Sequence, residues 1–373
     1  MRNLLFTLFA LCLFSCAREV NETARTAEER LLEARVQVKY LDTLHKTESG
    51  AYYMIQAKGT GKPVSKESYV YVRYSTLDFN ENYFEKEVSS NSSLYDYSYY
   101  YGYGYDYGYN SGYSSSASSV KKLLTTEEKI AKQVGKYSPT IYYGPNLWIT
   151  GAYALMEGVD EVVLTMREGD KRRILLPSWL SSAGYSGSTN QYTATTIHDI
   201  EVIRVVGGVE DMEKFQIDSL ESYRNRYYPG IDSLAYGFYK KTLKEGTGDT
   251  LTIGNQVSIR YILRTLDHFV VETNIADSAK KFNIYNSSNA YAAMEGECKE
   301  DKIFEMMDSE GSSQSVITGF SKAIFNMKHG EEAVVFFYSD LGYGYQASGE
   351  IQPCSPLVYY LKVERTNFDE ESE

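Results

Sequence analysis

The chain has 373 residues, a formal net charge of −12 at pH 7 and 43% hydrophobic residues. A chain of this length typically forms two domains, and its apolar content is sufficient for packed cores. The negative charge argues against a nucleic-acid-binding protein, because phosphate groups would repel the chain.

The N-terminus has the pattern of an export signal. Arg2 precedes the apolar run "LLFTLFALCLF", which is too short to span a bilayer comfortably and ends in "LFSC", Leu13 to Cys16. This ending resembles the lipobox of bacterial lipoproteins, in which a peptidase cuts before the cysteine and the thiol receives a diacylglycerol. We therefore expect residues 1–15 to be a lipoprotein signal peptide and a lipid on Cys16 to anchor the protein in the cell envelope, with the outer membrane as the expected location. An ordinary secretory signal is the alternative.

Residues 16–47 are predicted to form a tether and one helix. Within "TAEERLLEARVQVKYLDTL", Thr26 and Glu29 fit a capping box. Three apolar positions give a partial stripe, namely Leu32, Val36 and Leu41. We expect the helix to pack on the following domain or to space that domain from the membrane.

An internal repeat decides the expected architecture. The segment "GAYYMIQAKGTG" at Gly50 returns as "GFYKKTLKEGTG" at Gly237, and with the same offset "YVYVRY" (69–74) falls on "QVSIRY" (256–261). A second constant offset aligns "MEGVDEVVLTMREGDKRRILL" with "ITGFSKAIFNMKHGEEAVVFF". Each unit is thus predicted to be α+β, with one short helix packed across an antiparallel sheet.

The repeat defines two domains and a connection between them. The first covers residues 48–206, with a Tyr/Gly/Ser-rich insertion at about 87–120, and the second covers 236–366, before an acidic tail at 367–373. The segment "GVEDMEKFQIDSLESYRNRYYPG" predicts a charged amphipathic helix within a linker at 207–235. The insertion has no hydrophobic periodicity, so we expect a mobile surface segment. An aromatic surface that binds chains or glycans is the alternative.

The second unit resembles the FKBP family of peptidyl-prolyl cis-trans isomerases. The family pattern V-I-x-G-W, then M-x-x-G-E, corresponds to "VITGF" (316–320) and "MKHGE" (327–331), and the Tyr-Gly before the flap corresponds to "LGYG" (341–344). The closing Pro and L-V-x-x-x-x-V correspond to Pro353 and "PLVYYLKVE", and the early V-x-V-x-Y corresponds to residues 257–261. The resemblance covers roughly 48–206 more weakly. It implies two FKBP-like domains, each a bent sheet wrapped around one helix.

The resemblance also implies an isomerase that acts on X-Pro bonds of proline-containing polypeptides and needs no cofactor. Such an amide isomerises slowly because resonance holds it planar, but no bond has to break, so no nucleophile is required. An apolar pocket can strip water from the amide, and a hydrogen-bond donor can hold the twisted carbonyl. This fits a segment in which no His, Cys or Ser resembles a nucleophile.

The expected site of the second unit follows residue by residue from the family pattern. The residues implied for catalysis are Tyr261, Glu272, Ile317, Phe320, Tyr343 and Tyr359, and those implied for substrate binding are Val271, Val316 and Ile351. Phe320, where the family often has Trp, is the floor under the proline ring, and Tyr343 supplies the hydroxyl for a substrate carbonyl. Glu272 replaces the family's Asp and Val271 its Phe, and both changes weaken the match.

The first unit keeps only part of this pattern. Its matching substrate-binding positions are Tyr74, Phe84, Glu85 and Met156. Val159 occupies the floor position, Ser182 falls where the hydroxyl-bearing Tyr would be, and His198 falls where Phe would be. Because floor and hydroxyl are lost together, we expect a binding or structural module here.

The remaining reactive side chains give few signals. The four histidines, at positions 45, 198, 268 and 329, have no metal-ligand spacing, so no metal site is predicted. Cys298 and Cys354 can form a disulfide, since an exported protein meets oxidising conditions, or stay as two buried thiols. Beyond the isomerase, a non-catalytic chaperone and a subunit of an envelope protein complex stay open as functions.

Overall fold

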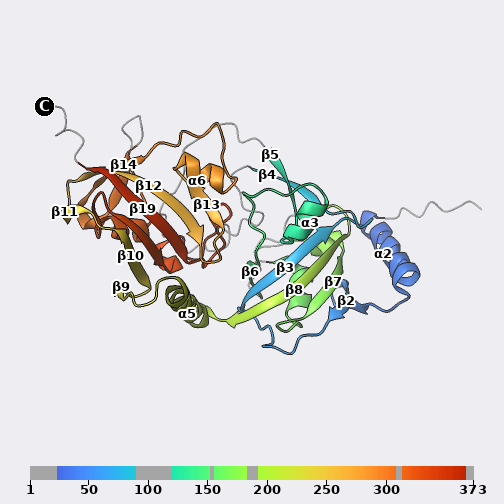
Figure 1. Cartoon of the computed structure of the whole chain (residues 1–373). Coiled ribbons are helices and arrows are strands. Elements are labelled where there is room, and N and C mark those ends of the chain that lie inside the picture. Colours follow the sequence, from blue (N-terminus) through green and yellow to red (C-terminus); the bar gives the residue numbers. More distant parts are fainter. Residues whose placement is uncertain (1–22, 90–118, 152–154, 183–191, 308–312, 367–373) are drawn as a thin grey trace, which may run out of the picture.

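The structure is a computed structural model that describes residues 23–89, 119–151, 155–182, 192–307 and 313–366 (Figure 1). The predicted signal peptide, the lipidation site Cys16, most of the Tyr-rich insertion and the acidic tail lie outside the described residues. None of the helices within the described ranges is long and apolar enough to cross a membrane.

Domain 1 is built on a six-stranded antiparallel sheet. Across the sheet its strands follow the order β1 (His45–Lys46), β2 (Tyr52–Ala57), β7 (Lys171–Leu176), β8 (Thr196–Gly207), β3 (Tyr69–Leu77) and β6 (Asn146–Ile149). Helix α4 (Glu157–Val163) packs across one face of the sheet. A hairpin of β4 (Glu85–Ser89) and β5 (Ser119–Leu123), followed by α3 (Glu128–Gln133), completes the domain.

Domain 2 has a nine-stranded sheet of the same design. Its strands follow the order β9 (Ser233–Ala235), β10 (Phe238–Lys244), β18 (Glu332–Phe337), β19 (Leu357–Thr366), β12 (Gln256–Thr265), β14 (Met294–Cys298), β15 (Phe304–Met307) and β16 (Ser313–Ser315), and β13 (Val270–Thr273) also pairs with β12. Helix α7 (Thr318–Ile324) packs across one face. The smaller elements of this domain are α6 (Ala276–Lys281), the paired β11 (Thr247–Thr250) and β17 (Lys328–His329), and the 3₁₀ turns η3 (Glu300–Lys302) and η4 (Ser339–Leu341), whereas the 3₁₀ turn η2 (Ser178–Leu180) belongs to domain 1.

The two sheets share one register. Tyr52 pairs with Leu175 in domain 1, and the repeat-equivalent Tyr239 pairs with Phe336 in domain 2. On the neighbouring strands the pairs are Thr76 with His198, and Leu263 with Tyr359. A one-residue slip would turn every side chain to the other face, so the shared register preserves the same inward-facing positions in both domains. The predicted α+β fold with two FKBP-like domains is confirmed.

A glycine in each short helix lets that helix lie against the sheet. A Cβ atom on Gly319 would come within 2.4 Å of the Phe337 ring, and one on Gly158 would come within 2.5 Å of Leu176. These two glycines are repeat-equivalent, and so are the two side chains that they face. The glycine of the "VITGF" motif is therefore needed for close helix–sheet packing.

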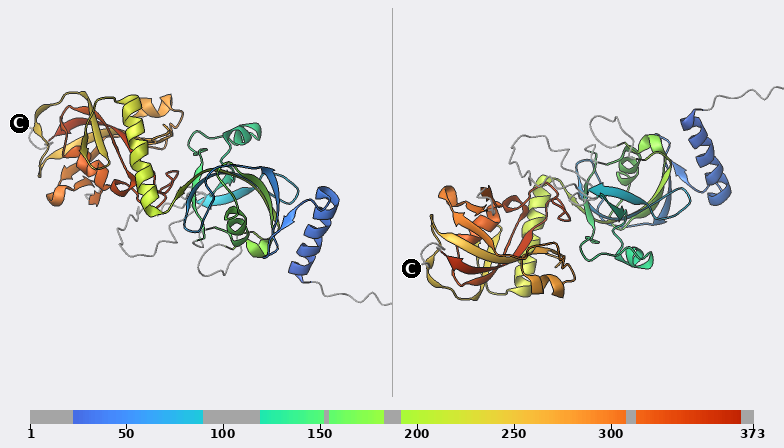
Figure 2. Two further views of the ribbon diagram at one scale, coloured as in Figure 1. Left: turned by 90° about the horizontal axis from the view of Figure 1, so that it is seen from below. Right: turned by 90° about the horizontal axis from the view of Figure 1, so that it is seen from above.

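A longer helix covers the outer face of each sheet. Helix α2 (Ala24–Tyr40) lies beside domain 1, and α5 (Val209–Tyr227) lies beside domain 2 (Figure 2). Val36 of α2 packs against Leu175 and Ile197, and Tyr223 of α5 packs against the equivalent strand face of domain 2. The second of these faces consists of Tyr239, Val334, Phe336 and Val358. The linker helix is thus an integral part of domain 2, and the repeated unit includes the helix that precedes each sheet.

The start and the end of α2 differ from the predicted ones. The helix is capped by Thr23, whose hydroxyl accepts a hydrogen bond from the Thr26 backbone N–H, so the capping box at Thr26 and Glu29 is wrong. Leu41 is 76% exposed and ends the helix in a left-handed conformation, while Tyr40 takes its place in the apolar stripe. Leu32, Val36 and Tyr40 are spaced four residues apart and so lie on one face of the helix, whereas Leu41 does not continue this spacing.

The two cysteines of the folded domains are free, buried thiols. Cys298 packs in the core of domain 2, whereas Cys354 lies in a different apolar cluster with Leu147 and Met212. The disulfide between Cys298 and Cys354 is therefore not formed, and the alternative of two buried thiols holds.

Candidate active site

Three aromatic side chains from different elements meet on the α7 face of the domain 2 sheet. Phe320 comes from the first turn of α7, Tyr261 from β12 and Tyr359 from β19. The ring centroids of Phe320 and Tyr359 are 5.2 Å apart with the rings at 78°, and those of Phe320 and Tyr261 are 6.1 Å apart at 87°. Edge-to-face packing of this kind adds to the stabilisation from burial. Phe320, the predicted floor of the site, is thus in contact with two aromatic side chains that form its walls.

Tyr261 is tied to Glu272 across the edge of this cluster. The Tyr261 hydroxyl donates a 3.1 Å hydrogen bond to Glu272 Oε1, and β13 carries Glu272 alongside β12. The Glu272 side chain, which is longer than the Asp of the family pattern, therefore still reaches the tyrosine. The sequence had suggested that this replacement weakens the match to that pattern. Burial, followed by the negative charge of Glu272, raises the pKa of Tyr261, so the phenol stays protonated and remains a donor.

Glu272 itself lies at the rim, where its side chain is exposed to solvent. Desolvation raises the pKa of its carboxyl, and the hydrogen bond from Tyr261 acts in the opposite direction. By accepting this hydrogen bond, Glu272 orients the Tyr261 phenol.

Tyr343 lies beside this rim, in the loop that follows η4. Its ring packs against the domain 2 core, and its pKa is raised by burial and then by the charge of Glu272. The hydroxyl is therefore neutral and able to donate. Ile351, from the same loop, is 2% exposed and packs into the core, and Val271, Val316 and Ile317 are half-buried around the cluster.

Ile317 also offers a backbone donor. It is the residue before α7, and its carbonyl accepts hydrogen bonds from the N–H groups of Phe320 and Ser321. Within the described residues no backbone carbonyl accepts from the Ile317 N–H. All nine predicted site residues of domain 2 thus lie in or around one cluster, and they comprise an apolar floor, aromatic walls and several hydrogen-bond donors.

Domain 1 fills the equivalent position with its own side chains. Tyr74, Met156 and Val159 are 2%, 5% and 1% exposed. Tyr192 enters from the loop before β8 and packs edge-on against Phe84, with ring centroids 5.2 Å apart. The Tyr192 ring also lies 5.7 Å from His198. The predicted substrate-binding residues Tyr74, Phe84 and Met156 are therefore core residues here.

The polar residues of this domain also have local partners. His198 is bonded to Thr76 through Nδ1 at 3.2 Å and to Thr196 through Nε2 at 2.8 Å. Full burial lowers the pKa of His198 to about 4, so the imidazole is neutral at pH 7. Glu85 pairs with Lys136 at 3.1 Å on the surface. Sequence reasoning missed Tyr192, since it lies in the stretch where the two repeats align least.

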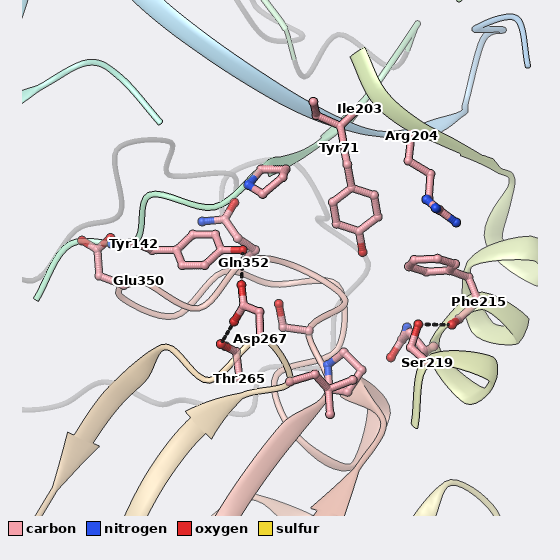
Figure 3. Close-up of a pocket in the computed structure, with 15 residues that line it drawn as sticks. Tyr71, Tyr142, Ile203, Arg204, Phe215, Ser219, Thr265, Asp267, Glu350 and Gln352 are labelled. Atoms are coloured by element: carbon pink, nitrogen blue, oxygen red, sulfur yellow. Dashed lines mark hydrogen bonds between the residues drawn. The ribbon is translucent and has the colours of Figure 1, made fainter. Parts of the chain in front are cut away.

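A cavity of about 280 Å³ lies elsewhere, between the two domains (Figure 3). Its walls include Tyr71, Tyr142, Phe215, Asp267, Glu350 and Gln352, and none of the aromatic residues of the cluster contributes to it. Domain junctions are a common place for such cavities. No sequence signal predicted this one, because it depends on how two separately folded domains meet.

The sequence profile of the FKBP-type peptidyl-prolyl cis-trans isomerases matches residues 248–364, a segment that contains the whole aromatic cluster. No curated protein matches the chain. Among solved structures, a peptidyl-prolyl cis-trans isomerase from Pseudomonas syringae pv. tomato is 22% identical over 42% of this chain and 95% of its own, with a TM-score of 0.30. FkpA from Escherichia coli is 17% identical over 42% of this chain and 63% of its own, also with a TM-score of 0.30.

The structure of the three FKBP domains of wheat FKBP73 covers 87% of this chain and 99% of its own, at 16% identity and a TM-score of 0.26. The profile match, in contrast, falls on the segment in which the motif residues form one cluster. Residues 248–364, which form most of the C-terminal domain, thus match the family of FKBP-type peptidyl-prolyl cis-trans isomerases.

Proposed function

We propose that domain 2 catalyses cis-trans isomerisation of X-Pro bonds in exported polypeptides. The observation that carries this proposal is the convergence of Phe320, Tyr261 and Tyr359 beneath a rim that holds Tyr343 and the Tyr261–Glu272 hydrogen bond. An apolar floor with neutral donors above it is what a reaction without bond cleavage requires.

The residues would act on the amide by differential binding. Phe320 and its aromatic neighbours receive the proline ring and exclude water from the amide. The Ile317 N–H and the Tyr343 hydroxyl donate to carbonyl groups of the bound chain. Each hydrogen bond that improves as the amide twists lowers the barrier, and about 1.4 kcal/mol of selective stabilisation gives a tenfold rate increase. Glu272 keeps the Tyr261 phenol in place through its hydrogen bond.

The test is a refolding assay limited by proline isomerisation, with the intact chain as catalyst. We expect acceleration by the wild type, a strong loss in Tyr343→Phe, and near-complete loss in Tyr343→Phe combined with Phe320→Ala. The matched control is Ser182→Ala, which changes the equivalent position in domain 1 and should leave the rate unaffected. A wild-type protein that does not accelerate refolding would reject the enzyme function.

We further propose that the protein acts from a lipid anchor on Cys16 in the cell envelope of a bacterium. Support comes from the "LFSC" ending of the apolar N-terminal run. Two or more acyl chains hold a protein stably on a membrane, because each buried CH₂ contributes about 0.8 kcal/mol. The variant Cys16→Ser should lose incorporated palmitate and leave the membrane fraction. Equal palmitate incorporation in variant and wild type would exclude this site.

A second candidate is a chaperone that binds unfolded chains without isomerising them. It is favoured by one observation, the 2% exposure of Phe320, since a floor this well covered leaves little free surface for a proline ring. Suppressed aggregation of a test protein with no gain in refolding rate would support it. Co-purification with envelope proteins would support a role as a subunit of an assembly.

A further inference from the structure

The loop between η4 and β19, residues 342–356, is enclosed by both domains. One side packs on domain 2, where Tyr343 and Ile351 join the aromatic cluster. The other side faces domain 1, where Glu350 and Gln352 line the cavity between the domains (Figure 3). Glu350 and Ile351 are neighbours in this loop, so they couple the domain junction to the candidate site.

Glu350 is the main polar contact of this loop with domain 1. Its Oε1 lies 2.6 Å from Lys122 Nζ, and the two side chains are only 19% and 11% exposed. Its Oε2 accepts a 2.9 Å hydrogen bond from the backbone N–H of Tyr142. Both carboxylate oxygens are thus bound by domain 1, in surroundings that screen the charges poorly.

Tyr142 connects the same region to a second part of domain 2. Its hydroxyl donates a 2.8 Å hydrogen bond to Asp267 Oδ2 (Figure 3). Its ring packs edge-on against Phe269, with the ring centroids 5.3 Å apart. Asp267 and Phe269 belong to the turn between β12 and β13, the strands that carry Tyr261 and Glu272. One residue of domain 1 therefore contacts both segments that form the rim of the site.

Apolar contacts hold the two ends of the loop. The Tyr345 ring lies 6.3 Å from the Tyr69 ring of domain 1. Cys354 packs in the cluster that also contains Leu147 of domain 1 and Met212 of α5. Inside the loop, Ser348 and Ile351 exchange backbone hydrogen bonds at 3.1 and 2.9 Å. The segment is thus a compact turn whose outer surface rests on domain 1.

We propose that domain 1 positions the active-site loop of domain 2, with Lys122 and Tyr142 as positioning residues that act through Glu350. This inference rests on the proposed isomerase function for its catalytic consequence. The physical basis is that removal of one partner of a largely buried ion pair leaves the other charge unpaired, which favours opening of the loop. Domain 1 thus has a role that needs no proline pocket of its own.

The test compares Lys122→Met with the wild type in the intact chain. We expect amide hydrogen exchange at Gly344, Ser348, Ile351 and Cys354 to accelerate about tenfold, because loop opening becomes easier when Glu350 loses its partner. We also expect kcat/KM for proline-containing peptides to fall about threefold or more, mainly through a higher KM, because the Tyr343 hydroxyl that would bind the substrate lies on the same loop. The double variant Lys122→Glu with Glu350→Lys should restore both values in part, because it re-forms the ion pair but not the hydrogen bond from the Tyr142 N–H.

The control is Lys132→Met, which removes a 2.6 Å ion pair with Glu128 on the surface of the same domain and should change neither value. Unchanged loop exchange in Lys122→Met would overturn the proposal, as would faster exchange with wild-type kinetics. If the wild type itself lacks isomerase activity, the proposed function fails, while the exchange measurement still decides whether domain 1 holds the loop.

Discussion

Domains 1 and 2 share strand order and register, but they differ in what occupies the face of the sheet beneath the short helix. In domain 2 the aromatic residues Tyr261, Phe320 and Tyr359 form a cluster with a polar rim. In domain 1 Tyr192 closes over the equivalent position, with Val159 as its floor. The comparison shows that a fold of this family can be kept by its register and helix packing while its pocket is lost to local substitutions.

Among the predicted changes, Phe320→Ala should have the largest effect on the difference between the two domains. We expect domain 2 to lose about 3–5 kcal/mol of unfolding free energy together with its isomerase activity, because a buried aromatic ring is replaced by a cavity. The equivalent change Val159→Ala in domain 1 removes fewer atoms and should leave isomerase activity intact. Urea denaturation and the refolding assay measure the two effects.

Phe320→Leu separates activity from stability, since it keeps most of the side-chain volume. Retained activity in Phe320→Ala, with domain 2 still folded, would contradict the role of this residue as the floor.

His198 should make domain 1 sensitive to acid. Its pKa is lowered from 6.5 to about 4 in the folded chain, so the unfolded chain takes up a proton first as the pH falls. Stability that is present above pH 6.5 is therefore lost between pH 6.5 and pH 4, by up to about 3 kcal/mol. Domain 2 has Tyr359 at the equivalent position and therefore lacks this histidine.

Fluorescence of Trp148 and Trp179 during urea unfolding measures this effect, since both tryptophans of the chain lie in domain 1. In His198→Gln, the unfolding free energy of domain 1 should fall less between pH 6.5 and pH 4 than in the wild type. The same pH dependence in both proteins would show that other groups cause it.

Tyr261→Phe should have a smaller effect, confined to domain 2. Loss of the hydrogen bond to Glu272 should cost about 1 kcal/mol of unfolding free energy. It should also raise the pKa of Glu272, because the hydroxyl of Tyr261 favours the ionised carboxylate. Titration of Glu272 by NMR in wild type and variant checks the direction, and an unchanged titration would exclude the bond in solution.

The smallest effect is expected at the two thiols, which should not react with an alkylating reagent in the native protein. Burial raises the pKa of both Cys298 and Cys354 to about 12, so almost no thiolate forms in the native protein at pH 8. Iodoacetamide should leave both unmodified in the native chain and label both in guanidinium without reductant. Protection that persists in guanidinium would indicate a disulfide and contradict the structure.

The sequence predicted those features that local pattern controls. The repeated alternating strands and the "VITGF" and "MKHGE" motifs led to the fold and to the cluster around Phe320, because strand period and glycine spacing are properties of short segments. Tyr192 and the Lys122–Glu350 pair were not predicted, since each depends on a loop path or on the way the two domains meet. The reach of Glu272 to Tyr261 also depended on backbone placement and not on residue type.

Helix α5 has a practical consequence for any shortened form of the protein. A fragment that begins at residue 236 would lack this helix and uncover Tyr239, Val334, Phe336 and Val358. A water-exposed apolar strand face of this kind promotes self-association. A fragment that begins at Gly208 retains the helix, including the Gln216 side chain that accepts a 2.8 Å hydrogen bond from the Ser339 backbone N–H. Soluble, monomeric domain 2 should therefore be obtained only when the cut is made ahead of α5.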